Sequence, residues 1–177
     1  MDLYDIFEEN VDNLAEKIPF GGKFPLELLE GYDWNRHMHA LDSHPRNRLD
    51  LNSTKFRIGL NVFHQRESCP AFAKDIERIL SEVFSLHNNR ISNIAFTGFG
   101  PDSDSYPRHK DEMDVFLVQI IGDIKIQVEG LHEEPVPFLP GDYYWIPRGV
   151  YHQVFPITSR VSFSFGVEGD PDPSVYF

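Results

Sequence analysis

Apolar positions in the first part of the chain recur at helical spacing. Between residues 3 and 18 they lie three or four positions apart, which predicts one amphipathic helix, and Pro19 with Gly21 and Gly22 ends it. Pro25 opens a short second helix over 25–30, because proline is tolerated in a first turn, and Gly31 follows as a stop. The same spacing over 71–86 predicts a longer helix that covers one side of a sheet.

After residue 90 the pattern changes to the alternation typical of β-strands. Strands are predicted over 91–97, 114–121, 124–129, 137–139, 143–146, 153–155 and 160–167, and an earlier strand over 55–63. Gly122 and Asp123 predict a tight hairpin turn between two of them. Many short strands joined by turns predict a β-sandwich or barrel.

Two of these strands have one polar and one apolar face. Over 124–129, Ile124 lies on the apolar face and its neighbour Lys125 points to the opposite one. Over 160–167, Arg160 and Ser162 share the polar face. If the apolar face of that strand packs under the helices, these two side chains point into the barrel.

The remaining segments are polar and rich in Gly, Pro, Ser and Asn. Residues 43–53 are expected to form a loop, residues 98–108 a second loop at the lip of the site, and residues 168–177 an extended tail. The length suits a single domain, 1–177. Within it we expect a helical N-terminal extension (1–54), a barrel (55–170) with the helix 71–87, and a short tail (171–177).

Composition narrows the classes of function. The formal net charge is -12, which disfavours nucleic acid and anionic membrane surfaces as partners. Cys69 is the only cysteine, so an internal disulfide and a cysteine-based zinc cluster are excluded, and a reducing, cytoplasmic location is expected. The first ten residues lack the basic start and apolar run of a signal peptide, and no apolar stretch is long enough to span a membrane.

Three residues form a candidate metal site. His109 and Asp111 are two apart, so in a strand both side chains point to the same side. His152 follows a Gly-Asp turn, a strand and a Pro-Arg-Gly bend, and is expected to start the next strand. Two imidazoles and one carboxylate with open positions are the facial triad of non-haem Fe(II) oxygenases.

The spacing around these residues resembles a known superfamily. Gly141, Pro147, Gly149 and His152 match the second cupin motif, with Pro156 at the place of its later asparagine. The segment from His109 through 122 resembles the iron-binding motif of the cupin-like JmjC hydroxylases, and the similarity covers 93–167. The resemblance implies a mainly β fold, the double-stranded β-helix, also described as a cupin or jelly-roll barrel. It also implies hydroxylation with Fe(II), 2-oxoglutarate as cosubstrate and O2.

The anchor for the distal carboxylate of 2-oxoglutarate departs from the JmjC pattern. The position fifteen residues after His109, usually Lys or Arg, is Ile124, and Lys125 faces the other way. An arginine fork suits a carboxylate, and an Arg-x-Ser pair shortly after the second histidine resembles the clamp of other Fe(II) oxygenases. Arg160 and Ser162 are therefore the expected 2-oxoglutarate anchor.

Several alternatives remain open. In the simplest competing interpretation, His109 and Asp111 are a surface pair and His152 is a core histidine. His37, His39 and His44 form a rival metal cluster by spacing, with exposed or substrate-lip positions as the favoured interpretation. The acidic run of Asp111, Glu112 and Asp114 is interpreted as partly metal ligand and partly solvated strand edge. The alternative functions are a metal cupin with 2-oxoglutarate-independent chemistry and a non-catalytic binding module. The substrate, a peptide or protein side chain or a small metabolite, is left open.

Overall fold

The structure is a computed structural model, and it describes residues 3–42, 58–62, 69–84, 91–103 and 105–169. Its strands are β1 (Phe20–Lys23), β2 (Ile58–Val62), β3 (Ile91–Gly98), β4 (Asp114–Ile121), β5 (Ile124–Val128), β6 (Val136–Phe138), β7 (Asp142–Ile146), β8 (His152–Pro156) and β9 (Arg160–Val167). Its helices are α1 (Leu3–Glu8), α2 (Val11–Ala15), the 3-10 helix η1 (Leu26–Leu29), α3 (Trp34–Asp42) and α4 (Ala71–Val83).

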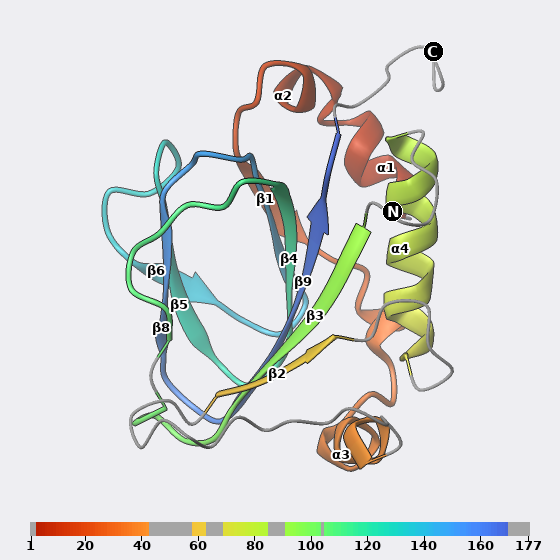
Figure 1. The fold of residues 1–177 in the computed structure, drawn as a ribbon, viewed down its shortest axis with the longest axis vertical. Coiled ribbons are helices and arrows are strands. Elements are labelled where there is room, and N and C mark those ends of the chain that lie inside the picture. Colours follow the sequence, from red (N-terminus) through yellow and green to blue (C-terminus); the bar gives the residue numbers. More distant parts are fainter. Residues whose placement is uncertain (1–2, 43–57, 63–68, 85–90, 104, 170–177) are drawn as a thin grey trace.

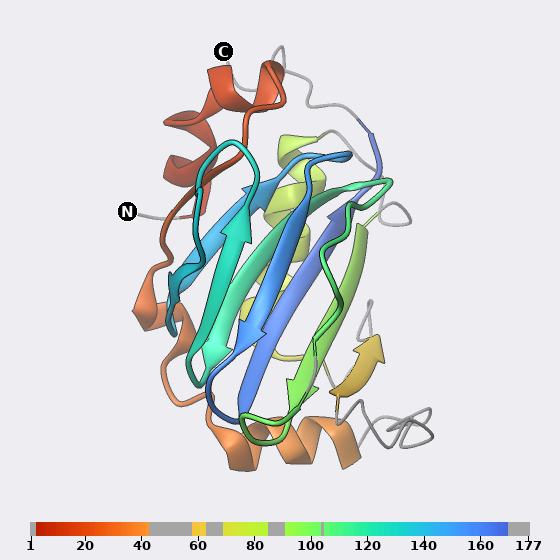
Figure 2. The same ribbon diagram turned by 90° about the vertical axis from the view of Figure 1, so that its left-hand side faces the viewer.

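The strands form two antiparallel sheets that face each other (Figures 1 and 2). The larger sheet has the order β1-β7-β4-β9-β3-β2 and the smaller one β6-β5-β8. Apolar side chains from both sheets meet between them and form an inner core, made of Val115, Leu117, Ile124, Ile126, Val128, Phe138 and Ile146. The predicted mainly β fold of the double-stranded β-helix type is confirmed.

The outer face of the larger sheet is covered by helices, as predicted. Helix α4 packs against β3 and β9 on the side away from the smaller sheet (Figure 1). Apolar residues of β9 and β4 point to this side and join the side chains of α1 and α4 in a second core, including Phe116, Val118, Phe163, Phe165, Ile76 and Leu80. Strand β4 is therefore buried on both faces, which explains its almost continuous apolar sequence.

The N-terminal segment differs from its prediction in three places. The single helix expected over 3–18 is wrong, because the chain breaks into α1 and α2 at Asn10, whose side chain donates to the Ile6 carbonyl at 2.9 Å. Helix α3 was not predicted, although Asp33 accepts the Arg36 N–H at 2.9 Å in the manner of an N-cap. The extension also contributes β1, which pairs with β7. The second predicted helix is present as η1.

The hairpin predicted at Gly122 is wrong. β4 already pairs with β7 on one edge and β9 on the other, so β5 has no free edge there and pairs with β6 and β8 in the other sheet. Gly122 is the corner between the sheets, with φ +74°, and an added Cβ would lie 1.9 Å from the Ser159 carbonyl oxygen. The corner therefore requires glycine.

The other predicted strands are found with small changes at their ends. Lys125 is exposed and Ile124 buried, as the alternation predicted. α4 ends at Val83, a few residues before the predicted end, and residues 85–90 lie outside the described residues. The loop at 43–53, His44, the tail 171–177 and the side chains of the strand predicted at 55–63 also lie outside the described residues or side chains.

Candidate metal centre and its pocket

The two histidines are brought together by backbone pairing. His109 and His152 form an isolated antiparallel bridge, with the His109 N–H donating to the His152 carbonyl at 3.0 Å and the reverse bond at 2.8 Å. The chain leaves this ladder after one pair, so His109 and Asp111 do not share a strand, the geometry from which their common side was inferred. Asp111 lies in the following turn, where its carbonyl accepts the Gly149 N–H at 3.0 Å. As predicted, His152 begins a strand, β8.

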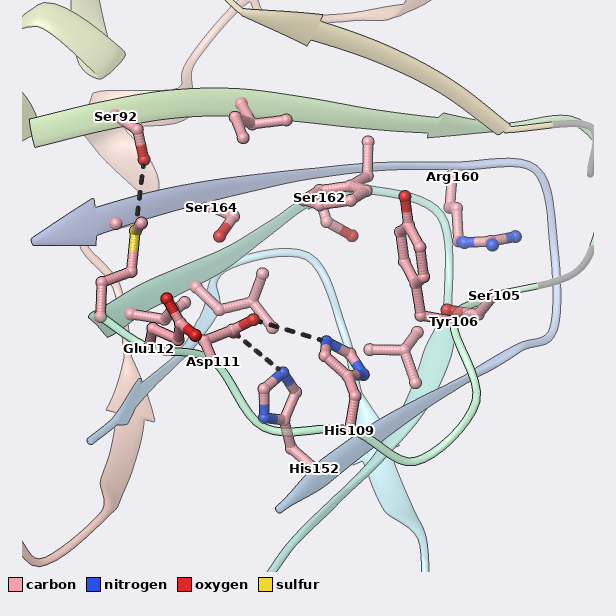
Figure 3. Close-up of a pocket in the computed structure, with 17 residues that line it drawn as sticks. Ser92, Ser105, Tyr106, His109, Asp111, Glu112, His152, Arg160, Ser162 and Ser164 are labelled. Atoms are coloured by element: carbon pink, nitrogen blue, oxygen red, sulfur yellow. Dashed lines mark hydrogen bonds and ion pairs between the residues drawn. The ribbon is translucent and has the colours of Figure 1, made fainter. Parts of the chain in front are cut away.

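The three predicted side chains converge (Figure 3). One Asp111 oxygen lies 3.9 Å from His109 Nε2 and the other 3.6 Å from His152 Nε2. One ligand atom from each residue lies within 4.8 Å of the others, and among the described residues no other such group of His, Cys, Asp or Glu occurs. These separations exceed hydrogen-bond lengths and leave space for a cation between the three groups.

Backbone carbonyls fix the two imidazole rings. His109 Nδ1 lies 2.9 Å from the Pro107 carbonyl oxygen, and His152 Nδ1 lies 3.3 Å from that of Val150. A carbonyl only accepts, so each Nδ1 carries the proton and each Nε2 presents its lone pair towards Asp111. Burial, and then the neighbouring His109 ring, lower the pKa of His152 below its ordinary value, which keeps the ring neutral and able to ligate at neutral pH.

This donor set fits a divalent transition metal. Two neutral imidazoles, oriented by second hydrogen bonds, and one carboxylate are the ligands that ferrous iron takes in non-haem oxygenases. One side of the group faces a cavity of about 570 Å³, which leaves room for further ligands. The residues present therefore fit the metal that the resemblance implied.

The cavity lies between the two sheets and has polar side chains along β9. Arg160, Ser162, Ser164 and Gly166 line one wall, as the alternation on this strand predicted (Figure 3). Apolar residues line the remainder, among them Ile94, Phe96, Val115, Leu117 and Val154. The 98–108 loop contributes Ser105 and Tyr106 and thus forms part of the lip, as expected.

Arg160 is buried at one end of this cavity. Its exposed fraction is 3%, and its guanidinium donates to the hydroxyl and, at 3.4 Å, to the carbonyl of Ser103. Gly98 makes room for it, since an added Cβ there would lie 2.5 Å from Arg160 Nη1. Burial lowers the pKa of Arg160 to about 10, which leaves it charged at neutral pH.

Ser162 is held by a residue that sequence reasoning did not assign. Its hydroxyl donates to Gln119 Oε1, and Gln119 Nε2 donates to the carbonyls of Ile121 and Gly122 at 2.8 and 2.7 Å. A polar residue inside the apolar run of β4 was the available signal. Ile124, at the JmjC anchor position, is fully buried in the inner core, so it offers no charge to a ligand.

Two other expectations about charged residues are corrected. Asp114 is not a solvated strand edge: it is 1% exposed and pairs with Lys17 Nζ at 3.0 Å. His37 is neither exposed nor at the substrate lip. It is fully buried, with Nδ1 2.9 Å from the Tyr32 hydroxyl and Nε2 2.8 Å from Thr97 Oγ1. Both partners are hydroxyls, which satisfy the ring in either tautomer.

Because His37 is buried, we expect the stability of the fold to decrease in acid. Burial lowers its pKa from 6.5 to about 4, so between these values the unfolded chain binds a proton that the folded chain does not. Its contribution to stability is complete above pH 6.5 and is lost as the pH falls towards 4. Urea unfolding should show the wild type losing about 3 kcal/mol more than His37→Gln over this range. The control is His39→Gln, because His39 is exposed on the same helix, and this variant should match the wild type. If the free energy of unfolding changed equally with pH in all three proteins, the prediction would be contradicted.

No protein-family model matches the sequence, and no curated protein matches it significantly. Among solved structures, the chain is similar to the Escherichia coli ribosomal oxygenase YcfD in complex with cobalt and 2-oxoglutarate, with TM-score 0.61, 18% identity and 95% of this chain covered. The structure of the same oxygenase with cobalt and succinic acid gives TM-score 0.62 at 17% identity, again over 95% of this chain. In both cases this chain spans about half of the oxygenase, 52% of its length.

Fold and comparison agree on the fold class. The chain folds as a double-stranded β-helix, and His109, Asp111 and His152 lie together beside its cavity. The ribosomal oxygenase is one of the solved structures to which this fold is similar. None of the helices in the described ranges has the length and apolar character needed to cross a lipid bilayer.

Proposed function

We propose that this protein is a Fe(II)- and 2-oxoglutarate-dependent dioxygenase that hydroxylates a small molecule or a peptide side chain. The observation that carries the proposal is the convergence of His109, Asp111 and His152 beside a cavity that the buried Arg160 also lines. The ion itself would supply the oxygen-activating redox chemistry. The likeness to an oxygenase that binds cobalt and 2-oxoglutarate supports this choice within the cupin fold.

In this proposal the chain's own residues bind and orient. The two histidines and Asp111 would hold the ion on one side and leave the cavity side open. Arg160 would donate a two-pronged hydrogen bond to the distal carboxylate of 2-oxoglutarate. Ser162 would donate a further one only by turning its single hydroxyl proton from Gln119 Oε1 to the ligand. Apolar side chains line most of the remaining cavity wall, so the bound ligand would lie in a largely apolar environment.

The identity of residue 124, an isoleucine, supports a second candidate function. The absence of charge at the usual JmjC anchor position also agrees with a metal cupin whose chemistry does not use 2-oxoglutarate. The two functions differ in what binds at the Arg160 end, since only a 2-oxoacid with a distal carboxylate uses that arginine. The choice of ligand therefore separates them.

The test is anaerobic addition of 2-oxoglutarate to the Fe(II)-loaded protein, followed by exposure to O2. We expect a visible absorption band on binding and then slow formation of succinate, even without the main substrate. 2-Oxopentanoate is the matched control, because it keeps the 2-oxoacid end and has a methyl group in place of the distal carboxylate. It should bind at least about tenfold more weakly, since it forgoes the charge-assisted hydrogen bonds. Equal binding of both acids, or no band with either, would contradict the proposal.

A further inference from the structure

A buried carboxylate outside the ligand set follows the candidate ligand Asp111 closely in the chain. Asp114 begins β4, three residues after Asp111, and is 1% exposed. Its Oδ1 accepts the Arg148 N–H at 2.8 Å, and its Oδ2 pairs with Lys17 Nζ at 3.0 Å. A carboxylate is buried at low cost only when charge and hydrogen bonds compensate it, and these contacts supply both.

The Arg148 contact connects Asp114 to the segment that carries His152. Arg148 and Gly149 lie in the turn between β7 and β8, and Gly149 precedes that ligand by three residues. The Arg148 N–H bonds to the Asp114 side chain, and the next N–H, of Gly149, bonds to the Asp111 carbonyl at 3.0 Å. Two consecutive amides of the turn are thus hydrogen-bonded to the segment that carries Asp111 and Asp114.

Lys17 occupies a backbone position that favours glycine. Its φ is +56°, the only positive φ of a non-glycine residue in the described ranges. The Ile18 N–H bonds to the Asn13 carbonyl at 2.8 Å and the Lys17 N–H to the Leu14 carbonyl at 3.3 Å, which is the Schellman ending of α2. A lysine is costly in this conformation. Its ion pair with Asp114 gives a reason for the lysine side chain at this position.

We propose that Asp114 is a positioning residue of the metal centre and that Lys17 compensates its charge. The inference rests on the proposed metal site. It makes the N-terminal segment part of the support for the ligands, in addition to its role as a cover of the sheet. Asp114 acts through the turn that precedes His152 and does not itself contact the ion.

The test is titration of the full-length apoprotein with Co(II), read by calorimetry and by the visible spectrum of the bound ion, which reports the ligand arrangement. Asp114→Asn removes the charge and should weaken Co(II) binding about tenfold and change the spectrum, as other outer-shell substitutions do. Lys17→Gly should relax the backbone at the end of α2 and still weaken binding severalfold. A lysine that served only the helix ending would give the opposite result, with Co(II) affinity and spectrum unchanged in Lys17→Gly.

Lys23→Met is the matched control. Lys23 also comes from the N-terminal segment and pairs with Asp142 of the same sheet, away from the metal ligands, so its loss should change neither affinity nor spectrum. If the wild type binds Co(II) and both Asp114→Asn and Lys17→Gly behave like it, the inference is wrong and the metal site stands. If the wild type binds no Co(II), the proposed function fails and the inference with it. Should Asp114→Asn not fold, Lys17→Gly decides alone.

Discussion

Asp111→Ala is expected to bind Co(II) at least about 100-fold more weakly than the wild type. Loss of an outer-shell partner already lowers metal affinity by roughly 10- to 100-fold. Within the described ranges, Asp111 is the one carboxylate grouped with both Nε2 atoms. With Fe(II) and 2-oxoglutarate, succinate formation should fall to the background rate. Isothermal titration of the apoprotein measures the first effect and a succinate assay the second.

Glu112→Ala provides the comparison for this variant. Glu112 is the adjacent carboxylate and lines the same cavity, but it is not part of the three-residue group. Its removal should leave Co(II) affinity unchanged. Thermal unfolding of both apoproteins controls for stability, and only a small difference is expected because Asp111 is about one-third exposed, 36%. Wild-type affinity in Asp111→Ala would remove the basis for the proposed metal site.

Arg160→Ala is expected to weaken 2-oxoglutarate binding to the Co(II)-loaded protein by roughly 100- to 1000-fold. The substitution removes a buried, charged donor and leaves the distal carboxylate without its partner, which costs on the order of 3–4 kcal/mol. Arg160→Lys keeps the charge but loses the planar fork, so its affinity should be intermediate. Calorimetry on the cobalt protein measures these affinities without turnover.

Two controls make this result specific. Binding of 2-oxopentanoate should be nearly the same in the wild type and in Arg160→Ala, because that acid has no distal carboxylate to lose. Arg108→Ala should leave 2-oxoglutarate affinity unchanged, since Arg108 is exposed, pairs with Glu129 and lies over the Tyr151 ring on the outside of the barrel. Unchanged 2-oxoglutarate affinity in Arg160→Ala would show that Arg160 is not the anchor.

Predictions from the sequence were correct for features that depend on residues close together in the chain. Alternation along β5 and β9 correctly placed Lys125 outside and Arg160 with Ser162 inside, because successive side chains of a strand point to opposite faces. The spacing of apolar residues over 71–86 correctly predicted a helix there, and α4 covers Ala71–Val83 of that range. The three candidate ligands were chosen by residue type and order along the chain, and the structure brings them together.

Predictions failed where a distant segment decides the conformation. The Gly122 turn has the sequence of a hairpin, but β4 was already paired on both edges by β7 and β9, which lie later in the chain. His37 looked like an exposed ligand candidate until Tyr32 and Thr97 enclosed it. Asp114 looked like a surface acid until Lys17 and the Arg148 amide were seen to meet it.

The sequence by itself determined the barrel class, the faces of its strands and the chemical types of the candidate ligands, because each depends on periodicity or residue type within a short stretch. Only the tertiary structure decided which strands pair, which polar residues are buried and what holds the turn before His152. Those properties depend on contacts between residues far apart in the chain, such as Lys17 and Asp114, and a local pattern contains no information about its distant partner.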